Sequence, residues 1–198
     1  MRAARHFLGT AVLIAASVLT APVASATPAN GAKPAFGAAL SASMRQLVRA
    51  IEADSPSLAQ PLFFSESVYI SMKTGLIADP ARDYRDRLIA LYNLDLWAYH
   101  QRLVGSSTSF IRFEADPGLA TWIAPGTCEN RIGYWHEPGV RLVVERDHQV
   151  VSALVTSLIS WHGLWYVVHL GPNPRPHEVG TVAGFMRGPG RPGPGGGC

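Results

Sequence analysis

The side chains of this 198-residue chain that are best suited to chemistry are histidines in the segment ISWHGLWYVVHLG, residues 159–171. An imidazole at His169 could act as a general acid or base. His162 and Gly163 form instead a typical two-residue hairpin loop, because glycine adopts positive φ without strain and histidine tolerates it. We therefore expect His162 to be a turn residue only. His169 is the first candidate catalytic residue.

The position of this loop predicts the register of the two strands that flank it. With His162 and Gly163 at the turn, Thr156 pairs with His169. His169 and Trp165 then share one face of the hairpin, and that face is mixed in polarity. Such a face is typical of a pocket wall or an interface, whereas a slip of one residue would reverse the assignment.

His100 and Tyr69 are two further candidate catalytic residues. His100 follows Asp95 by five residues on a predicted helix, a spacing that does not place the two side chains above one another. The alternative interpretation is that both belong to the polar flank of an amphipathic helix. Tyr69 carries a phenol that could donate a proton inside a pocket.

The aromatic side chains form a second group with two interpretations. Most of them should belong to the hydrophobic core, but aromatic rings with a few polar groups also line ligand pockets. The candidate ligand-binding residues are Tyr69, Tyr92, Trp97, Trp135, Trp165 and His169.

No metal site and no cofactor are expected. The sequence has no His-Glu-x-x-His, no paired Cys-x-x-Cys and no phosphate-binding loop. His162, His169 and His177 are separated by a turn, a strand and a tail, so they are not expected to converge on a metal ion.

Three elements are expected before residue 75. Apolar residues at helical spacing predict a helix that ends near Asp54. Ser55 and Pro56 are suited to begin a short second helix, over about residues 56–63. The alternation in SESVYISM, residues 65–72, predicts a strand.

A long helix has the clearest start signal in the chain. Asp79 is a good N-cap before a proline, and apolar residues then recur at helical spacing until Gly105 ends the helix. Asp83 and Arg87 form an i,i+4 pair of favourable orientation. A bend is expected near residues 93–95.

From Ser109 the hydrophobic period changes to two, which predicts consecutive strands. The expected strands are SFIRFEA, NRIGYWH, VRLVVER, HQVVSALVTSLISW and LWYVVHL. A turn over residues 137–139, Glu-Pro-Gly, should separate the second strand from the third. Helices followed by an antiparallel run predict an α+β fold, with the N-terminal helices packed on a curved, cone-like sheet in a single domain.

This order of elements resembles the nuclear transport factor 2-like superfamily, a cystatin-like α+β cone that includes SnoaL-like domains. The residues that carry the resemblance are LVRAIEADSPSLAQPLFFSESVYI, residues 47–70, and the ending SWHGLWYVVHL, residues 160–170. The superfamily contains isomerases, dehydratases, binding modules and oligomerisation domains. The resemblance therefore implies a fold and a cavity, but no catalytic residue.

The N-terminal residues 1–26 are typical of a secretory signal peptide, so a secreted or cell-envelope protein is expected. Arg2 and Arg5 precede an apolar run, and the small residues of ASA, 24–26, form a cleavage signal. The apolar run is too short for a good membrane span, and no later segment is longer, so no transmembrane segment is expected.

The remaining boundaries follow from composition. Residues 27–37 are expected to be a flexible leader, 38–171 the α+β domain, and 172–198 a disordered Gly/Pro-rich tail. Loss of the signal peptide lowers the Lys and Arg count from 17 to 15 against 14 acidic residues, a net charge of +1. Without a clustered basic face, no nucleic-acid partner is expected. Cys128 and Cys198 could form a disulfide within the chain, or Cys198 could be free or pair with another molecule.

Three functions remain open at this point. The first is a non-enzymatic secreted module that binds a small apolar ligand or a protein partner. The second is a SnoaL-like acid–base enzyme of the isomerase, dehydratase or hydrolase type. The third is an interaction module that forms a homodimer through its sheet face.

Overall fold

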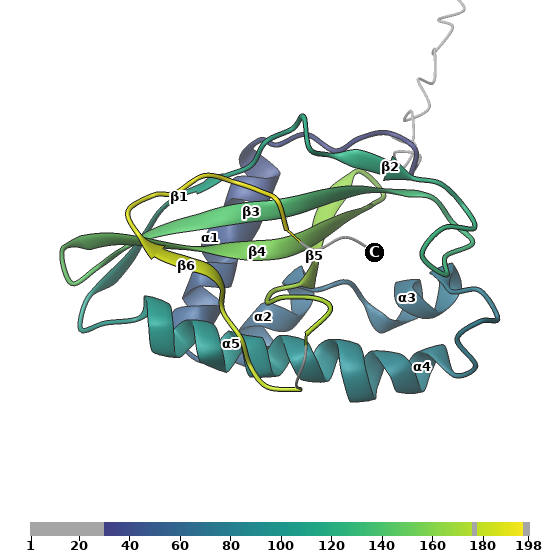
Figure 1. Ribbon diagram of the computed structural model, residues 1–198, viewed down its shortest axis with the longest axis horizontal. Helices are drawn as coiled ribbons and strands as arrows, with labels where there is room; N and C mark the ends of the chain where they lie inside the picture. The colour runs from purple at the N-terminus through teal and green to yellow at the C-terminus, as the bar shows by residue number, and fades with distance from the viewer. Residues whose placement is uncertain (1–29, 176–177, 196–198) are drawn as a thin grey trace, which may run out of the picture.

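The computed structural model describes residues 30–175 and 178–195 (Figure 1). Helices are followed by a six-stranded antiparallel sheet that does not close, which confirms the expected α+β single domain. The predicted signal peptide, His177 and Cys198 lie outside the described residues. Within those residues no helix is long and apolar enough to cross a membrane.

The two N-terminal helices form as predicted. Helix α1 (Ala38–Glu52) buries an apolar stripe that includes Leu47 and Ile51. Helix α2 (Pro56–Ala59) starts at Ser55, whose side chain accepts a hydrogen bond from the N–H of Leu58, and continues into the 3₁₀ turn η1 (Gln60–Leu62). The first described residues also make contacts, because the Phe36 ring packs 5.1 Å from that of Trp165.

The strand expected over residues 65–72 is wrong, because this segment forms helix α3 (Glu66–Met72). Tyr69 and Met72 are three residues apart and are both buried, whereas Ile70 is 39% exposed. A helix places residues three apart on the same face, and a strand does not. Tyr69 also donates a hydrogen bond to Asp83 of the next helix, so tertiary contacts select the helix over the local alternation.

The long helix begins at the predicted residue and consists of three parts. Asp79 accepts a hydrogen bond from the N–H of Arg82 at 2.9 Å and caps α4 (Pro80–Asp83). A π-helical stretch, η2 (Tyr84–Ile89), and then α5 (Ala90–Leu103) continue the helix. The irregular stretch therefore lies before the bend that was expected near residues 93–95.

The sheet is built on two long central strands. β3 (Tyr134–Arg146) and β4 (Gln149–Trp161) pair along most of their length. β1 (Thr108–Glu114) and β2 (Thr121–Ile123) pair with different parts of β3. β5 (Leu164–His169) and β6 (Ala183–Arg187) pair with different parts of β4.

The turn predicted over residues 137–139 is wrong, because these residues continue β3. β1 and β2 leave this part of β3 without a partner strand on one edge, a position where Pro138 is tolerated. Gly139 has a φ of +65°, and a side chain there would meet the backbone of Gly193. The Gly193 N–H donates to the Gly139 carbonyl at 2.6 Å.

The hairpin between β4 and β5 confirms the predicted loop, with φ of +47° at His162 and +80° at Gly163. The predicted register holds as far as the pair of Leu158 and Val167. Beyond it a bulge pairs His169 with Ser157 and not with Thr156. Two successive residues, 168 and 169, therefore line the same cavity, so the predicted assignment of His169 to the face of Trp165 is wrong.

The disordered tail expected from residue 172 is wrong for the residues that form β6. Asp95 of α5, 1% exposed, holds the start of this C-terminal segment. Its carboxylate accepts two hydrogen bonds from Arg175, at 2.7 and 2.8 Å, and one each from the N–H groups of Gly171 and Thr181. In Figure 1 the segment, in yellow, crosses in front of the sheet, while α1 passes behind it.

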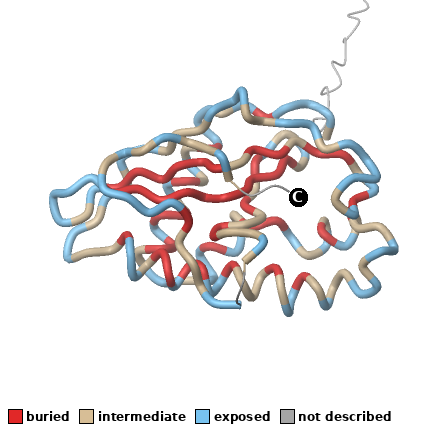
Figure 2. The backbone as a smooth tube through the Cα atoms, in the orientation of Figure 1, coloured by how far each residue is buried: buried red, intermediate tan, exposed pale blue. Residues whose placement is uncertain are grey.

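The core lies between the helices and the sheet, and β3 and β4 are its most buried strands (Figure 2). All residues from Val151 to Ser160 are buried. The helices cover one face of these strands. The C-terminal segment contacts the other face, where Arg141 donates to the carbonyl groups of Gly184 and Arg191. Cys128 is disulfide-bonded.

Candidate functional site

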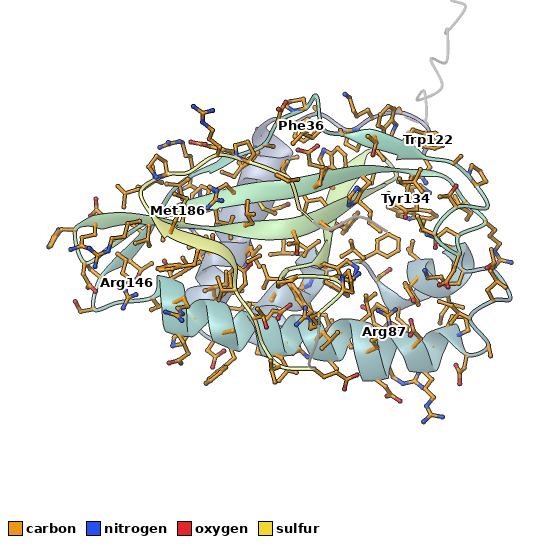
Figure 3. All side chains as sticks on the ribbon, in the orientation of Figure 1. Phe36, Arg87, Trp122, Tyr134, Arg146 and Met186 are labelled. Carbon is orange, nitrogen blue, oxygen red and sulfur yellow. The ribbon has the colours of Figure 1, made fainter. Side chains whose placement is uncertain are left out.

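A cavity of about 580 Å³, here called the central cavity, lies between α3, the long helix and strands β3 to β5. Its apolar wall is formed by Phe64, Met72, Ile77, Leu88, Ile159 and Val168. Its polar wall includes Tyr69, Lys73, Arg87, His136, Ser157 and His169. In Figure 3 the labelled Arg87 lies on the helical layer and Tyr134 on the sheet, and both line this cavity.

A hydrogen-bonded network fixes the helical side of the polar wall. Arg87 donates to both carboxylate oxygens of Asp83, each at 2.7 Å, and also to the Tyr69 hydroxyl at 3.3 Å. Tyr69 in turn donates to Asp83. Hydrogen bonding from Arg87 holds the pKa of Asp83 below its usual value, and burial raises the pKa of Tyr69. The network is therefore an ion pair capped by a neutral phenol.

Lys73 provides a second cationic group, directly after α3. Its Nζ lies 4.8 Å from the centre of the Tyr69 ring. No carboxylate of the described residues lies within ion-pair distance of this ammonium. Burial lowers the pKa of Lys73, and the charge of Glu129 partly opposes that change.

The sheet side carries two histidines. His136 of β3 has its Nε2 2.6 Å from the Oγ of Ser157 on β4, and burial lowers its pKa. His169 has its Nε2 3.0 Å from the amide nitrogen of Asn173. Burial, assisted by the charges of Arg87 and other cationic groups, lowers the pKa of His169 to about 3. Both imidazoles are therefore neutral at neutral pH.

The structure brings two of the predicted site residues, Tyr69 and His169, into the central cavity. His100 lies elsewhere, with its Nδ1 2.8 Å from the Ile51 carbonyl oxygen. Asp95 pairs with Arg175 and not with His100.

The other predicted ligand-binding residues line no part of the central cavity. Tyr92 is buried against Phe63, with ring centres 4.4 Å apart. Trp97 is 55% exposed. Trp135 donates from Nε1 to the Gly31 carbonyl, and Trp165 packs on the Phe36 ring.

Sequence reasoning missed Lys73, Arg87, His136 and Ser157 as cavity residues. Arg87 was predicted as the partner of Asp83 in an i,i+4 pair on the long helix. His136 and Ser157 are 21 residues apart and meet only through the register of β3 and β4. The alternation of NRIGYWH could have placed His136 on one face of the sheet, but not opposite a serine.

Among the described residues no three His, Cys, Asp or Glu side chains converge in a way that could hold a metal ion. The possible chemistry is that of two neutral imidazoles, two phenols, a hydroxyl, two cationic groups and the carboxylates of Asp83 and Glu129. Comparisons of the chain with protein-family models, with curated proteins and with solved structures found no match.

Proposed function

We propose that this protein is a secreted module that binds a small organic molecule with an apolar body and a negatively charged end in the central cavity. The volume supports this proposal, because small-molecule pockets span roughly 300 to 1,000 Å³ and this cavity measures about 580 Å³.

The division of the lining determines how such a ligand would lie. The side chains of Met72, Leu88 and Ile159 offer an apolar surface on which a hydrocarbon body loses its contact with water. Polar residues line the rest of the cavity, and hydrogen bonds to them would fix the orientation of the ligand.

The observation that carries the charged end is Lys73. A half-buried ammonium with no carboxylate within ion-pair distance is costly, and an anionic ligand would reduce that cost. Arg87 adds a second cation, whose Nη1 makes no hydrogen bond to any described residue. Asp83 forms an ion pair with Arg87, whereas Asp83 and Glu129 act on Lys73 only from beyond ion-pair distance, so Lys73 should contribute more to the affinity for an anion.

Titration calorimetry with octanoate and with octanol tests this proposal. We expect octanoate to bind at least tenfold more tightly than octanol, and Lys73→Met to remove that difference while octanol binding stays unchanged. Lys33→Met is the matched control, because Lys33 lies over Trp135 and does not line the cavity. Equal affinity for the two probes in the unmodified protein would refute the charged end.

Acid–base catalysis in the same cavity is the second candidate function, and His136 favours it. A neutral imidazole can accept a proton, and its contact with Ser157 keeps it oriented. His169, with a pKa near 3, is too weak a base for this role at neutral pH. Proton–deuterium exchange at the carbon next to the carbonyl of 2-octanone, followed by NMR, would show the activity. We expect His136→Asn to abolish it, and exchange at the buffer rate in the unmodified protein would exclude it.

A further inference from the structure

A second hollow, of about 380 Å³, lies on the other side of Phe64 from the central cavity. Here it is called the aromatic hollow, and its rings are Phe63, Phe64, Tyr84, Trp161 and Tyr166. These rings come from the η1 region, the long helix and the β4–β5 hairpin. We propose that the aromatic hollow is a binding site for an alkylated ammonium ion, separate from the ligand proposed for the central cavity.

Several of the rings that line the hollow also pack against one another. The Phe64 ring lies 6.2 Å from Trp161 and 6.3 Å from Tyr166, at interplanar angles of 84° and 69°. The Phe63 ring lies 6.0 Å from Tyr84. None of these three pairs is a parallel stack, so the rings surround the hollow at different orientations. Several aromatic rings around one point form the cage that recognises quaternary ammonium groups.

The charges that line the aromatic hollow are of one sign. Glu66 is the one carboxylate among its described lining residues, none of which is a lysine, arginine or histidine. Burial raises the pKa of the Tyr84 phenol, and the charge of Glu66 adds to that increase. A carboxylate together with the negative faces of aromatic rings attracts a cation and repels an anion.

The one ion pair of Glu66 does not remove this preference. Its Oε1 lies 3.0 Å from Arg85, and the two side chains are 39% and 56% exposed. Exposed pairs of this kind contribute little, about 0 to 1 kcal/mol, so a guest cation can compete for the carboxylate. The central cavity differs, because Lys73 and Arg87 line it together with the carboxylates of Asp83 and Glu129.

The hairpin loop holds one wall of the hollow in place. The His162 ring stacks on Trp161, with ring centres 4.5 Å apart and an interplanar angle of 20°. This contact covers one side of the indole and restricts its rotation. His162 is therefore a positioning residue for the Trp161 ring.

Binding of choline, compared with its uncharged carbon isostere 3,3-dimethyl-1-butanol, tests the proposal. NMR of the five indole N–H groups reports the position of the guest, since Trp161 lines the aromatic hollow and the other four do not. We expect choline to shift the Trp161 resonance and to bind about tenfold more tightly than the isostere, the range expected of a cation over desolvated aromatic rings.

Three variants separate this site from the central cavity. Glu66→Gln should weaken choline binding severalfold and leave the isostere unaffected, and Trp161→Leu should weaken it further. Lys73→Met should not change choline binding. Choline binding therefore remains a valid test of the aromatic hollow even if octanoate does not bind in the central cavity. Trp122→Leu is the matched control, because Trp122 is 41% exposed on β2 and does not line the hollow.

Either of two results would overturn the proposal. One is equal affinity for choline and the isostere. The other is a choline-induced shift at other indoles while the Trp161 resonance stays in place. The Glu66→Gln variant changes an exposed side chain, so unfolding does not confuse its result.

Discussion

Glu137→Gln should stabilise this protein increasingly as the pH rises. Glu137 lies on β3, is 0% exposed, and neither carboxylate oxygen has a hydrogen-bond partner among the described residues. Burial raises its pKa to about 7, and the carboxylate of Asp116 adds to that increase. The Asp116 N–H and the Lys33 ammonium favour the charged form, but the N–H lies outside hydrogen-bond geometry.

The sign and size follow from the two pKa values. Below pH 4.5 the carboxyl is protonated in both the folded and the unfolded chain, and above pH 7 it is ionised in both. Between them the folded protein holds a proton that the unfolded chain has lost, so the free energy of unfolding falls as the pH rises. At about 1.4 kcal/mol per pKa unit, the loss between about pH 5 and pH 8 amounts to about 2.5 kcal/mol.

Urea denaturation of both proteins across this pH range measures the effect. The glutamine does not titrate, so the difference in free energy of unfolding between variant and parent should grow by about 2.5 kcal/mol. Taking the difference cancels the other titrating groups, His136 and His169 included. Glu145→Gln, which removes an exposed carboxyl from the same strand, is the control, and its difference should change much less over this range. A flat difference for Glu137→Gln as well would refute the reasoning that burial without a partner holds this proton.

Three further predictions concern the fold. Arg175→Met leaves the Asp95 carboxylate buried without its cation, so it should lower the free energy of unfolding by about 3 to 5 kcal/mol. It should also increase amide hydrogen exchange in β6, and unchanged exchange there would contradict the anchoring role. Gly163→Val should cost about 1 to 2 kcal/mol because of the positive φ, while His162→Asn should stay within about 0.5 kcal/mol by thermal denaturation; equal costs would disprove the turn argument. In His169→Gln, the loss of stability from about pH 7 to pH 5 should be smaller by about 2 kcal/mol, because His169 is neutral when folded and its pKa in the unfolded chain is near 6.5. An unchanged acid profile in urea titrations would show that burial does not hold His169 neutral.

The sequence by itself determined the elements whose signals are local. The cap at Asp79 and the apolar stripe of α1 depend on residues within a turn or two, and each was placed correctly. The loop at His162 and Gly163 was placed correctly because only a few residues combine positive φ with a tight turn. A local conformational preference is visible wherever its residues are adjacent in the chain.

Only the tertiary structure decided the remaining elements. The segment of α3 alternates like a strand, yet packing of Tyr69 and Met72 on one face makes it helical. Pro138 is typical of a turn, yet it lies inside β3 because the neighbouring strands stop on either side of it. The sequence did not predict β6, because the segment is held by the ion pair of Asp95 with Arg175, which lies 80 residues later in the chain.

The two candidate sites were also decided only by the tertiary structure. Lys73, His136 and Ser157 line one cavity, and Glu66 and Trp161 line another, only after the strand registers and the bulge in β5 are set. Neither hollow has a contiguous motif, so no window of the sequence contains it. The physical reason is that a pocket is a property of surfaces brought together by packing, whereas a sequence pattern records the preferences of neighbours along the chain.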